Sequence, residues 1–127
     1  MRVLVDSWAW LEYFQKTPRG VQAAKYLDDA AVEKITTKIN VFEVYCKLLR
    51  ENGEMAAKNA VGAMLELSTL DALDLSTIQM AAEIKKTFQA GMADAIVAAT
   101  AMKENAKVLT GDDDFKKIRG IGLIFLE

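Results

Sequence analysis

Histidine is absent from this chain of 127 residues, and cysteine and proline occur once each. Without histidine, the protein can contain no Ser-His-Asp or Cys-His nucleophile system, no His-ligated zinc ion, and no imidazole general base. The single cysteine, Cys46, excludes an internal disulfide and a thiolate metal cage, and we expect it to be an ordinary buried residue. Any catalysis must therefore use carboxylates, hydroxyls, amines or a hard metal ion.

Long hydrophobic runs are also missing. No stretch approaches 18 apolar residues, and the segment Met1–Asp6 lacks the apolar core and cleavage site of a signal peptide. We therefore expect a cytoplasmic protein with no membrane partner. Apolar residues make up 52% of the chain and charged residues 27%, with a formal net charge of −2, which indicates one globular domain over residues 1–127.

Short β-branched runs alternate with segments of helical periodicity along the chain. We expect strands at 3–5, 34–36, 70–75, 107–110 and 123–126, and helices at 8–14, 21–27, 39–49, 54–67, 76–88 and 92–102. Pro18 and Gly20 indicate a turn, Ser76 is expected to cap the helix that it begins, and Met80, Ile84 and Phe88 should form the apolar stripe of that helix. This order predicts an α/β fold with a mainly parallel, four- to five-stranded sheet flanked by helices.

Four acidic positions lie in unusual surroundings. Asp6 follows an apolar strand, Glu43 lies within an apolar helix, Asp94 interrupts the most apolar helix, and Asp112 begins a run of three acids after a strand. Ligands of open α/β sheets bind at the carboxyl ends of the strands, where these groups can converge. Several carboxylates held together need a counter-charge, and oxygen ligands select Mg²⁺ or Mn²⁺. Such a site suits phosphodiester hydrolysis.

Each acid also has an ordinary structural explanation. Asp6 and Asp94 are placed to cap helices, Glu43 can pair with Lys47 one helical turn later, and the acids at 112–114 can form a solvated turn. Four such coincidences at strand ends and on apolar helices are less probable than one shared site.

The chain resembles the PIN domain family, and within it the toxin nucleases of virulence-associated protein C (VapC) type. The resemblance extends over essentially the whole chain. Four motifs carry it, in this order: VLVDS with WLEYF, NVFE, ADAIVAATA, and LTGDDDF. Each motif alone is a weak signal, whereas their order and spacing are specific.

This resemblance implies a metal-dependent endoribonuclease with Mg²⁺ or Mn²⁺ as cofactor. The implied catalytic and metal-binding acids are Asp6, Glu43, Asp94 and Asp112, with Asp6 and Asp94 as the expected direct ligands. The implied supporting residues are Ser7, Asn40, Thr110 and Asp114. The resemblance also implies a homodimer and, for the toxin subset, a cognate antitoxin protein that occupies the acidic groove. PIN domains that act in RNA processing or decay without an antitoxin are the alternative.

An RNA substrate requires positive charge somewhere on the surface. Without the five candidate acids, the remainder of the chain carries a net charge of about +3. We expect phosphate contacts from basic residues that follow two of the site segments, namely Lys16, Arg19, Lys116, Lys117 and Arg119. The aromatic residues Trp8, Trp10, Tyr13 and Phe14 are expected to form core or dimer contacts in preference to stacking on bases.

Three other classes of protein share part of this pattern. A receiver domain also binds Mg²⁺ at strand ends, but it would have adjacent acids after the first strand and an Asp that ends a central strand. A phosphatase of haloacid-dehalogenase type would have an acid two residues after Asp6, where this chain has Trp8. A binding module with a vestigial site would not need the complete acidic set.

Overall fold

All 127 residues are described by the computed structural model, which contains five strands, six α-helices and one short 3₁₀ helix. The strands are β1 (Arg2–Val5), β2 (Glu33–Thr36), β3 (Thr69–Leu70), β4 (Lys107–Thr110) and β5 (Gly122–Phe125). The helices are α1 (Ser7–Gln15), α2 (Pro18–Leu27), α3 (Lys38–Asn52), α4 (Glu54–Leu67), α5 (Leu75–Phe88), α6 (Met92–Glu104) and η1 (Asp113–Lys117). No helix is both long enough and apolar enough to span a lipid bilayer.

The five strands form one entirely parallel sheet in the order β3-β2-β1-β4-β5. The α/β fold with a parallel sheet of up to five strands is thus confirmed. The chain builds outward from β1 on one side, through β2 and β3, and then returns to build β4 and β5 on the other. This order differs from the 2-1-3-4-5 order of receiver domains, which removes that alternative.

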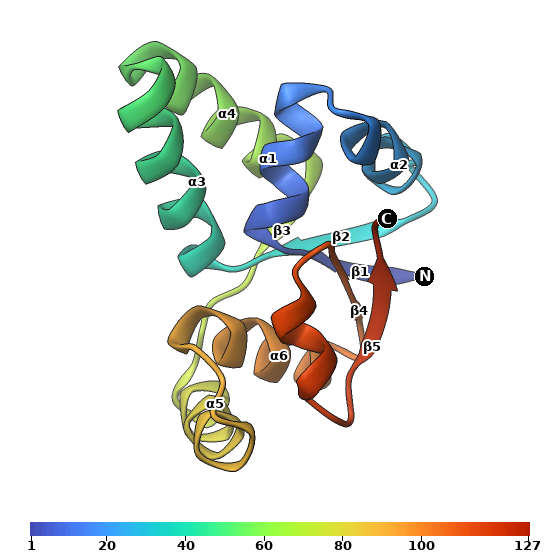
Figure 1. Cartoon of the computed structure of the whole chain (residues 1–127), viewed down its shortest axis with the longest axis vertical. Coiled ribbons are helices and arrows are strands. Elements are labelled where there is room, and N and C mark those ends of the chain that lie inside the picture. The colour runs from blue at the N-terminus through green and yellow to red at the C-terminus, as the bar shows by residue number, and fades with distance from the viewer.

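Helices cover both faces of the sheet (Figure 1), with α1 to α4 on one face and α5 and α6 on the other. The alternation of side chains along β1 explains the two cores. Val3 and Val5 pack under α1 to α4 with Trp10, whereas Leu4 packs under α5 and α6 with Phe115. Trp10 is fully buried, as expected of a core residue, and its indole N–H donates to Thr36 Oγ1 at 3.2 Å.

Several local expectations were wrong. Pro18 begins α2 where a turn was expected, since its fixed φ suits the first helical position and Thr17 caps that helix by accepting from the Gly20 N–H at 3.0 Å. The N-cap of α5 is Asp74, two residues before Ser76, and its carboxylate accepts from the Thr77 N–H at 3.0 Å. These hydrogen bonds hold the pKa of Asp74 below its usual range.

Three further differences concern side-chain exposure and strand length. Cys46 is exposed on α3, because it lies on the solvent side of that helix, away from the buried Val44 and Leu48. Met80 is also exposed, and the buried stripe of α5 consists of Thr77, Ala81 and Ile84. The expected strand at 70–75 is only the two residues of β3, since the chain leaves the sheet after Leu70.

Candidate metal and nuclease site

The site lies where the sheet reverses its order, between β1 and β4. In open α/β sheets, ligands bind at such a point, beyond the carboxyl ends of the two strands. Asp6 follows β1, and its backbone N–H donates to the Leu109 carbonyl at 3.1 Å. Its buried carboxylate accepts from Thr110 Oγ1, the last residue of β4, at 2.9 Å. Asp6 occupies the N-cap position of α1, but its side chain makes no capping hydrogen bond there.

A chain of hydrogen bonds connects α1 with the start of α3. Asn40 is fully buried, and its side-chain amide donates to Ser7 Oγ at 2.8 Å and, more weakly, to Asp6 Oδ1 at 3.4 Å. Because Ser7 Oγ accepts from Asn40, its own proton is free to donate to Glu43 Oε1, at 2.6 Å. The amide and the hydroxyl therefore hold Glu43 beside Asp6. Glu43 does not pair with Lys47, which forms its ion pair with Glu51 at 3.2 Å.

The same helix start explains why the Asn40 amide points into the site. Thr37 and Asn40 form a capping box, in which the Thr37 hydroxyl accepts from the Asn40 N–H at 3.0 Å and donates to Asn40 Oδ1 at 2.7 Å. With its oxygen held by Thr37, the amide can present only its NH₂ group to Asp6 and Ser7. Thr37 was not among the expected site residues, although the pattern Thr-x-x-Asn is visible in the sequence.

Three other acids form a compact group near Asp6. Asp94 lies in the first turn of α6, and Asp112 and Asp114 lie in the segment after β4. Carboxylate oxygens of these three residues all lie within 4.8 Å of one another. Asp112 caps η1 by accepting from the Asp114 N–H at 2.9 Å, so the expected acidic turn is the start of a 3₁₀ helix.

The site holds several carboxylates and no ion-paired cation. Burial, followed by the neighbouring charges of Asp94 and Glu43, raises the pKa of Asp6 to about 7 despite the hydrogen bond from Thr110. Burial and the charges of Asp112 and Asp114 raise the pKa of Asp94 to about 6. No Lys or Arg forms an ion pair with any of the five acids, which are Asp6, Glu43, Asp94, Asp112 and Asp114.

This donor set fits a hard divalent cation. Mg²⁺ binds oxygen at about 2.0–2.1 Å, so ligands on opposite sides of an octahedron lie roughly 4 Å apart. The oxygens of Asp94, Asp112 and Asp114 are within a small side-chain adjustment of that geometry. Asp6, which the sequence favoured as a direct ligand, is not in this closest group, whereas Asp114, expected only as a supporting residue, belongs to it.

The five basic residues expected to contact RNA lie in different places. Arg19 lies over the ring of Trp8, with its guanidinium carbon 5.5 Å from the ring centroid. Lys117 lies close enough to Asp94 to oppose the rise in its pKa, and its amine donates to the Gln89 carbonyl at 3.3 Å. Lys116 pairs with Asp113 at 3.0 Å, and Arg119 is exposed.

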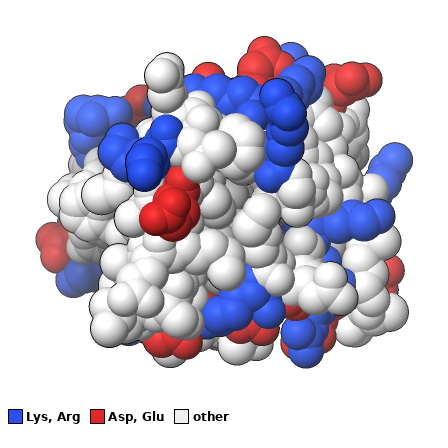
Figure 2. All heavy atoms as spheres, turned by 90° about the horizontal axis from the view of Figure 1, so that it is seen from below, with Lys and Arg blue, Asp and Glu red and all other residues white.

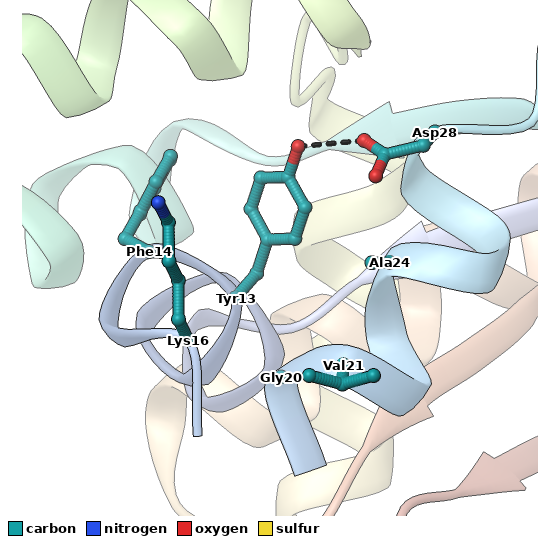
Figure 3. A pocket seen from close by; sticks show the side chains of 7 residues that line it. All are labelled: Tyr13, Phe14, Lys16, Gly20, Val21, Ala24 and Asp28. Atoms are coloured by element: carbon teal, nitrogen blue, oxygen red, sulfur yellow. Dashed lines mark hydrogen bonds between the residues drawn. The ribbon is translucent and has the colours of Figure 1, made fainter. Parts of the chain in front are cut away.

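Lys16 is remote from the acids. It follows α1, whose nine residues span about 13 Å from Ser7, and it lines a pocket between α1 and α2 (Figure 3). In that pocket the hydroxyl of Tyr13 donates to Asp28 at 2.7 Å. Lys16 therefore lies at the opposite end of α1 from Asp6, and its expected contact with RNA stays a prediction.

Two further residues lie at the site: Trp8, which was expected to form core or dimer contacts, and Gly111, to which the sequence assigned no role. A Cβ atom at position 111 would lie 2.4 Å from Cη2 of the Trp8 ring, so only glycine lets the acidic segment pack against the indole. The contact joins the first turn of α1 to the segment that bears Asp112. The small residue between Thr110 and Asp112 was the only signal of this close approach.

The parallel sheet and the carboxylate centre at its switch point define a class of small α/β domains with an oxygen-ligand metal site. The PIN domain family matches residues 3–121. The chain therefore belongs to the PIN domain family.

Curated relatives and solved structures agree with this assignment. The chain is 26% identical, over 124 residues, to VapC ribonuclease Mb1587 of Mycobacterium bovis and to ribonuclease VapC11 of Mycobacterium tuberculosis, covering 94% of this chain and 92% of each relative. The fold matches VapBC2 from Rickettsia felis bound to a promoter DNA fragment, with a TM-score of 0.82, 14% identity and full coverage of both chains. It also matches VapC20 of M. tuberculosis, described as a toxin that cleaves the sarcin-ricin loop, with a TM-score of 0.80, 18% identity, and 94% and 96% of the two chains covered.

Proposed function

We propose that this protein is an endoribonuclease that hydrolyses RNA phosphodiester bonds with Mg²⁺ or Mn²⁺ as cofactor, and that it is the toxin of a toxin-antitoxin pair. One observation carries the proposal: five carboxylates converge at the switch point of the sheet with no Lys or Arg partner. Such a group suits a divalent cation and a phosphate. The family assignment and the names of the VapC relatives support RNA as the substrate.

In this proposal the acids have different roles. Asp94, Asp112 and Asp114 would hold the cation, whose chemistry would be to polarise a phosphoryl oxygen and to lower the pKa of a water molecule. Glu43, oriented by the Ser7 hydroxyl, is placed to accept a proton from the attacking water. Asp6, whose carboxylate accepts from Thr110 at the end of β4, would add negative charge that attracts the cation to the site.

A protein partner and a second copy of the chain belong to the same proposal. Several structures with this fold are described as VapBC complexes, including those from R. felis and from nontypeable Haemophilus influenzae. We expect an antitoxin protein to bind this chain and to block RNA cleavage, and we expect the chain itself to form a homodimer. Copurification with the product of the neighbouring reading frame, and the mass of the complex in solution, test these expectations.

The nuclease proposal is tested with purified protein and a labelled RNA. Cleavage should require added Mg²⁺ or Mn²⁺, cease with EDTA, and fall by at least about 100-fold in Asp94→Asn. Asp113→Asn is the matched control, because Asp113 lies in the same acidic run but its side chain is 82% exposed and pairs only with Lys116. Cleavage that persists in EDTA, or an Asp94→Asn variant as active as Asp113→Asn, would refute the proposal.

A further inference from the structure

Arg19 is a cation without an acidic partner beside an acidic site. The ion pairs of the protein use Arg2, Lys47, Lys58, Lys103 and Lys116, and none uses Arg19. Arg19 is exposed in the first turn of α2, and its side chain forms no hydrogen bond within the protein. Its guanidinium lies instead over Trp8, 5.5 Å from the ring centroid. Such stacking restrains the side chain while leaving its N–H donors in the guanidinium plane available.

Trp8 places that cation at the edge of the site. The residue lies in the first turn of α1, two positions after Asp6, and is only partly buried. On its benzo edge it meets Gly111, where an added Cβ would lie 2.4–2.8 Å from three ring atoms. Gly111 connects Thr110, which donates to Asp6, with Asp112 of the acidic group. The indole therefore packs against the acidic segment at the edge of the site.

Positive charge flanks the acids from both layers of the fold. Arg19 belongs to the layer of α1 to α4, whereas Lys117 donates to the carbonyl of Gln89, at the end of α5 in the opposite layer. On the face that α5 presents, seen from below in Figure 2, basic and acidic side chains lie in small groups among neutral atoms. The unpaired Arg19 stands out because it is held in place by an aromatic ring.

The geometry points to Trp8 and Arg19 as a backbone clamp for RNA, in which the stacked guanidinium binds a phosphate of the substrate strand next to the phosphate that is cut. A guanidinium matches the two non-bridging oxygens of a phosphate with parallel N–H donors, and this contact fixes the position of the strand without selecting a base. The clamp sets which phosphate reaches the acids, and it rests on the proposed nuclease function.

Binding of a fluorescent single-stranded RNA in Mg²⁺, at several KCl concentrations, tests the clamp in an Asp6→Asn background that prevents cleavage. Arg19→Gln should weaken binding about tenfold and reduce the slope of log K against log salt by about 0.7, the value for one lost phosphate contact on a single strand. Arg50→Gln is the matched control, because Arg50 is exposed and unpaired on the last turn of α3, about 15 Å along that helix from Asn40. It should change neither quantity.

Variants of Trp8 separate the clamp from simple charge. Trp8→Leu leaves the net charge unchanged, yet it should weaken RNA binding almost as much as Arg19→Gln does. Trp8→Phe keeps an aromatic face and should retain most of the wild-type affinity for RNA. In the active protein, Arg19→Gln should raise KM with little change in kcat. Equal effects of Arg19→Gln and Arg50→Gln, or wild-type affinity in Trp8→Leu, would overturn the clamp. If the wild-type chain cleaves RNA and Arg19→Gln cleaves and binds it equally well, the clamp alone is refuted. If the wild-type chain neither cleaves nor binds RNA, both proposals are refuted.

Discussion

Replacing Asp6 by Asn should stabilise the metal-free protein while removing its activity. Asp6 is 6% exposed, and burial raises the pKa of its carboxyl to about 7. At pH 8 without a cation, the folded chain must hold this buried carboxylate ionised beside the charges of Asp94 and Glu43. The neutral amide of Asn removes that cost and keeps an oxygen that can accept from Thr110.

The magnitude follows from the two pKa values. The Asp6 carboxyl has a pKa of 3.8 in the unfolded chain and about 7 in the folded chain, so it binds its proton more tightly when the chain is folded. The protonated carboxyl therefore stabilises the fold, and this stabilisation is complete below pH 3.8. It is lost as the pH rises through 7. The difference corresponds to roughly 4 kcal/mol at 1.36 kcal/mol per pH unit. In Asp6→Asn, the new side-chain amide makes a poorer hydrogen bond with the Asn40 amide than the carboxylate does, and this reduces the gain in unfolding free energy by about 1 kcal/mol. We expect a net gain of about 3 kcal/mol, or roughly 12 °C in Tm.

Urea unfolding in EDTA between pH 5 and pH 8, followed by circular dichroism, measures this difference. The gap in unfolding free energy between Asp6→Asn and wild type should be roughly 2–3 kcal/mol wider at pH 8 than at pH 5, because the wild-type carboxyl is protonated in the fold at the lower pH. Asp113→Asn is the control, with an exposed side chain and an expected change near zero. A variant no more stable than wild type at pH 8, or a gap independent of pH, would refute the reasoning.

Two further predictions test the contacts that surround the acids. Gly111→Ala should lower the unfolding free energy by about 1–3 kcal/mol because its Cβ would overlap the Trp8 ring, and Trp8→Leu in the same chain should recover part of this loss, a coupling that a double-mutant cycle measures. Asn40→Ala should cost about 2–3 kcal/mol in urea unfolding, since it breaks the bonds to Thr37 and Ser7, and it should lower kcat more than KM changes because Glu43 loses its orientation. Equal stability of Asn40→Ala and wild type would contradict the hydrogen-bond chain.

Most of the fold could be predicted because its elements carry strong local signals. The apolar run at 3–5 and the periodic segment at 39–49 correspond to β1 and α3, and both extend only a few residues further in the structure. The ends of helices were less predictable where two nearby residues could both serve as the N-cap. Asp74 and Ser76 are both good N-caps, and the contact of Asp74 with Lys103 of α6, at 3.5 Å, is a tertiary feature that no local pattern contains.

The sequence indicated the acids of the candidate site but not which of them lie closest to one another. Asp6, Glu43 and Asp94 were recognisable because an isolated charge among apolar residues needs a reason to be there. Which acids approach one another depends on how α6 is rotated about its axis and on the path of the chain after Thr110. The two together bring Asp114 next to Asp94. The contact between Trp8 and Gly111 is likewise a consequence of β1 and β4 being neighbours, although their residues are about 100 positions apart in the chain.

The position of β1 explains why four distant segments supply one site. As the central strand, β1 places Asp6 at the point where the sheet reverses, so the segments after β1 and β4 and the first turns of α3 and α6 all begin beside it. Each of these segments starts at the same edge of the sheet, the edge at which open α/β sheets bind their ligands. An acid at any one of them would be an ordinary cap or a solvated charge. Acids after β1 and β4, in the first turn of α6 and in the second turn of α3, without histidine or an ion-paired Lys or Arg, leave a divalent cation as the counter-charge that the chemistry of the site requires.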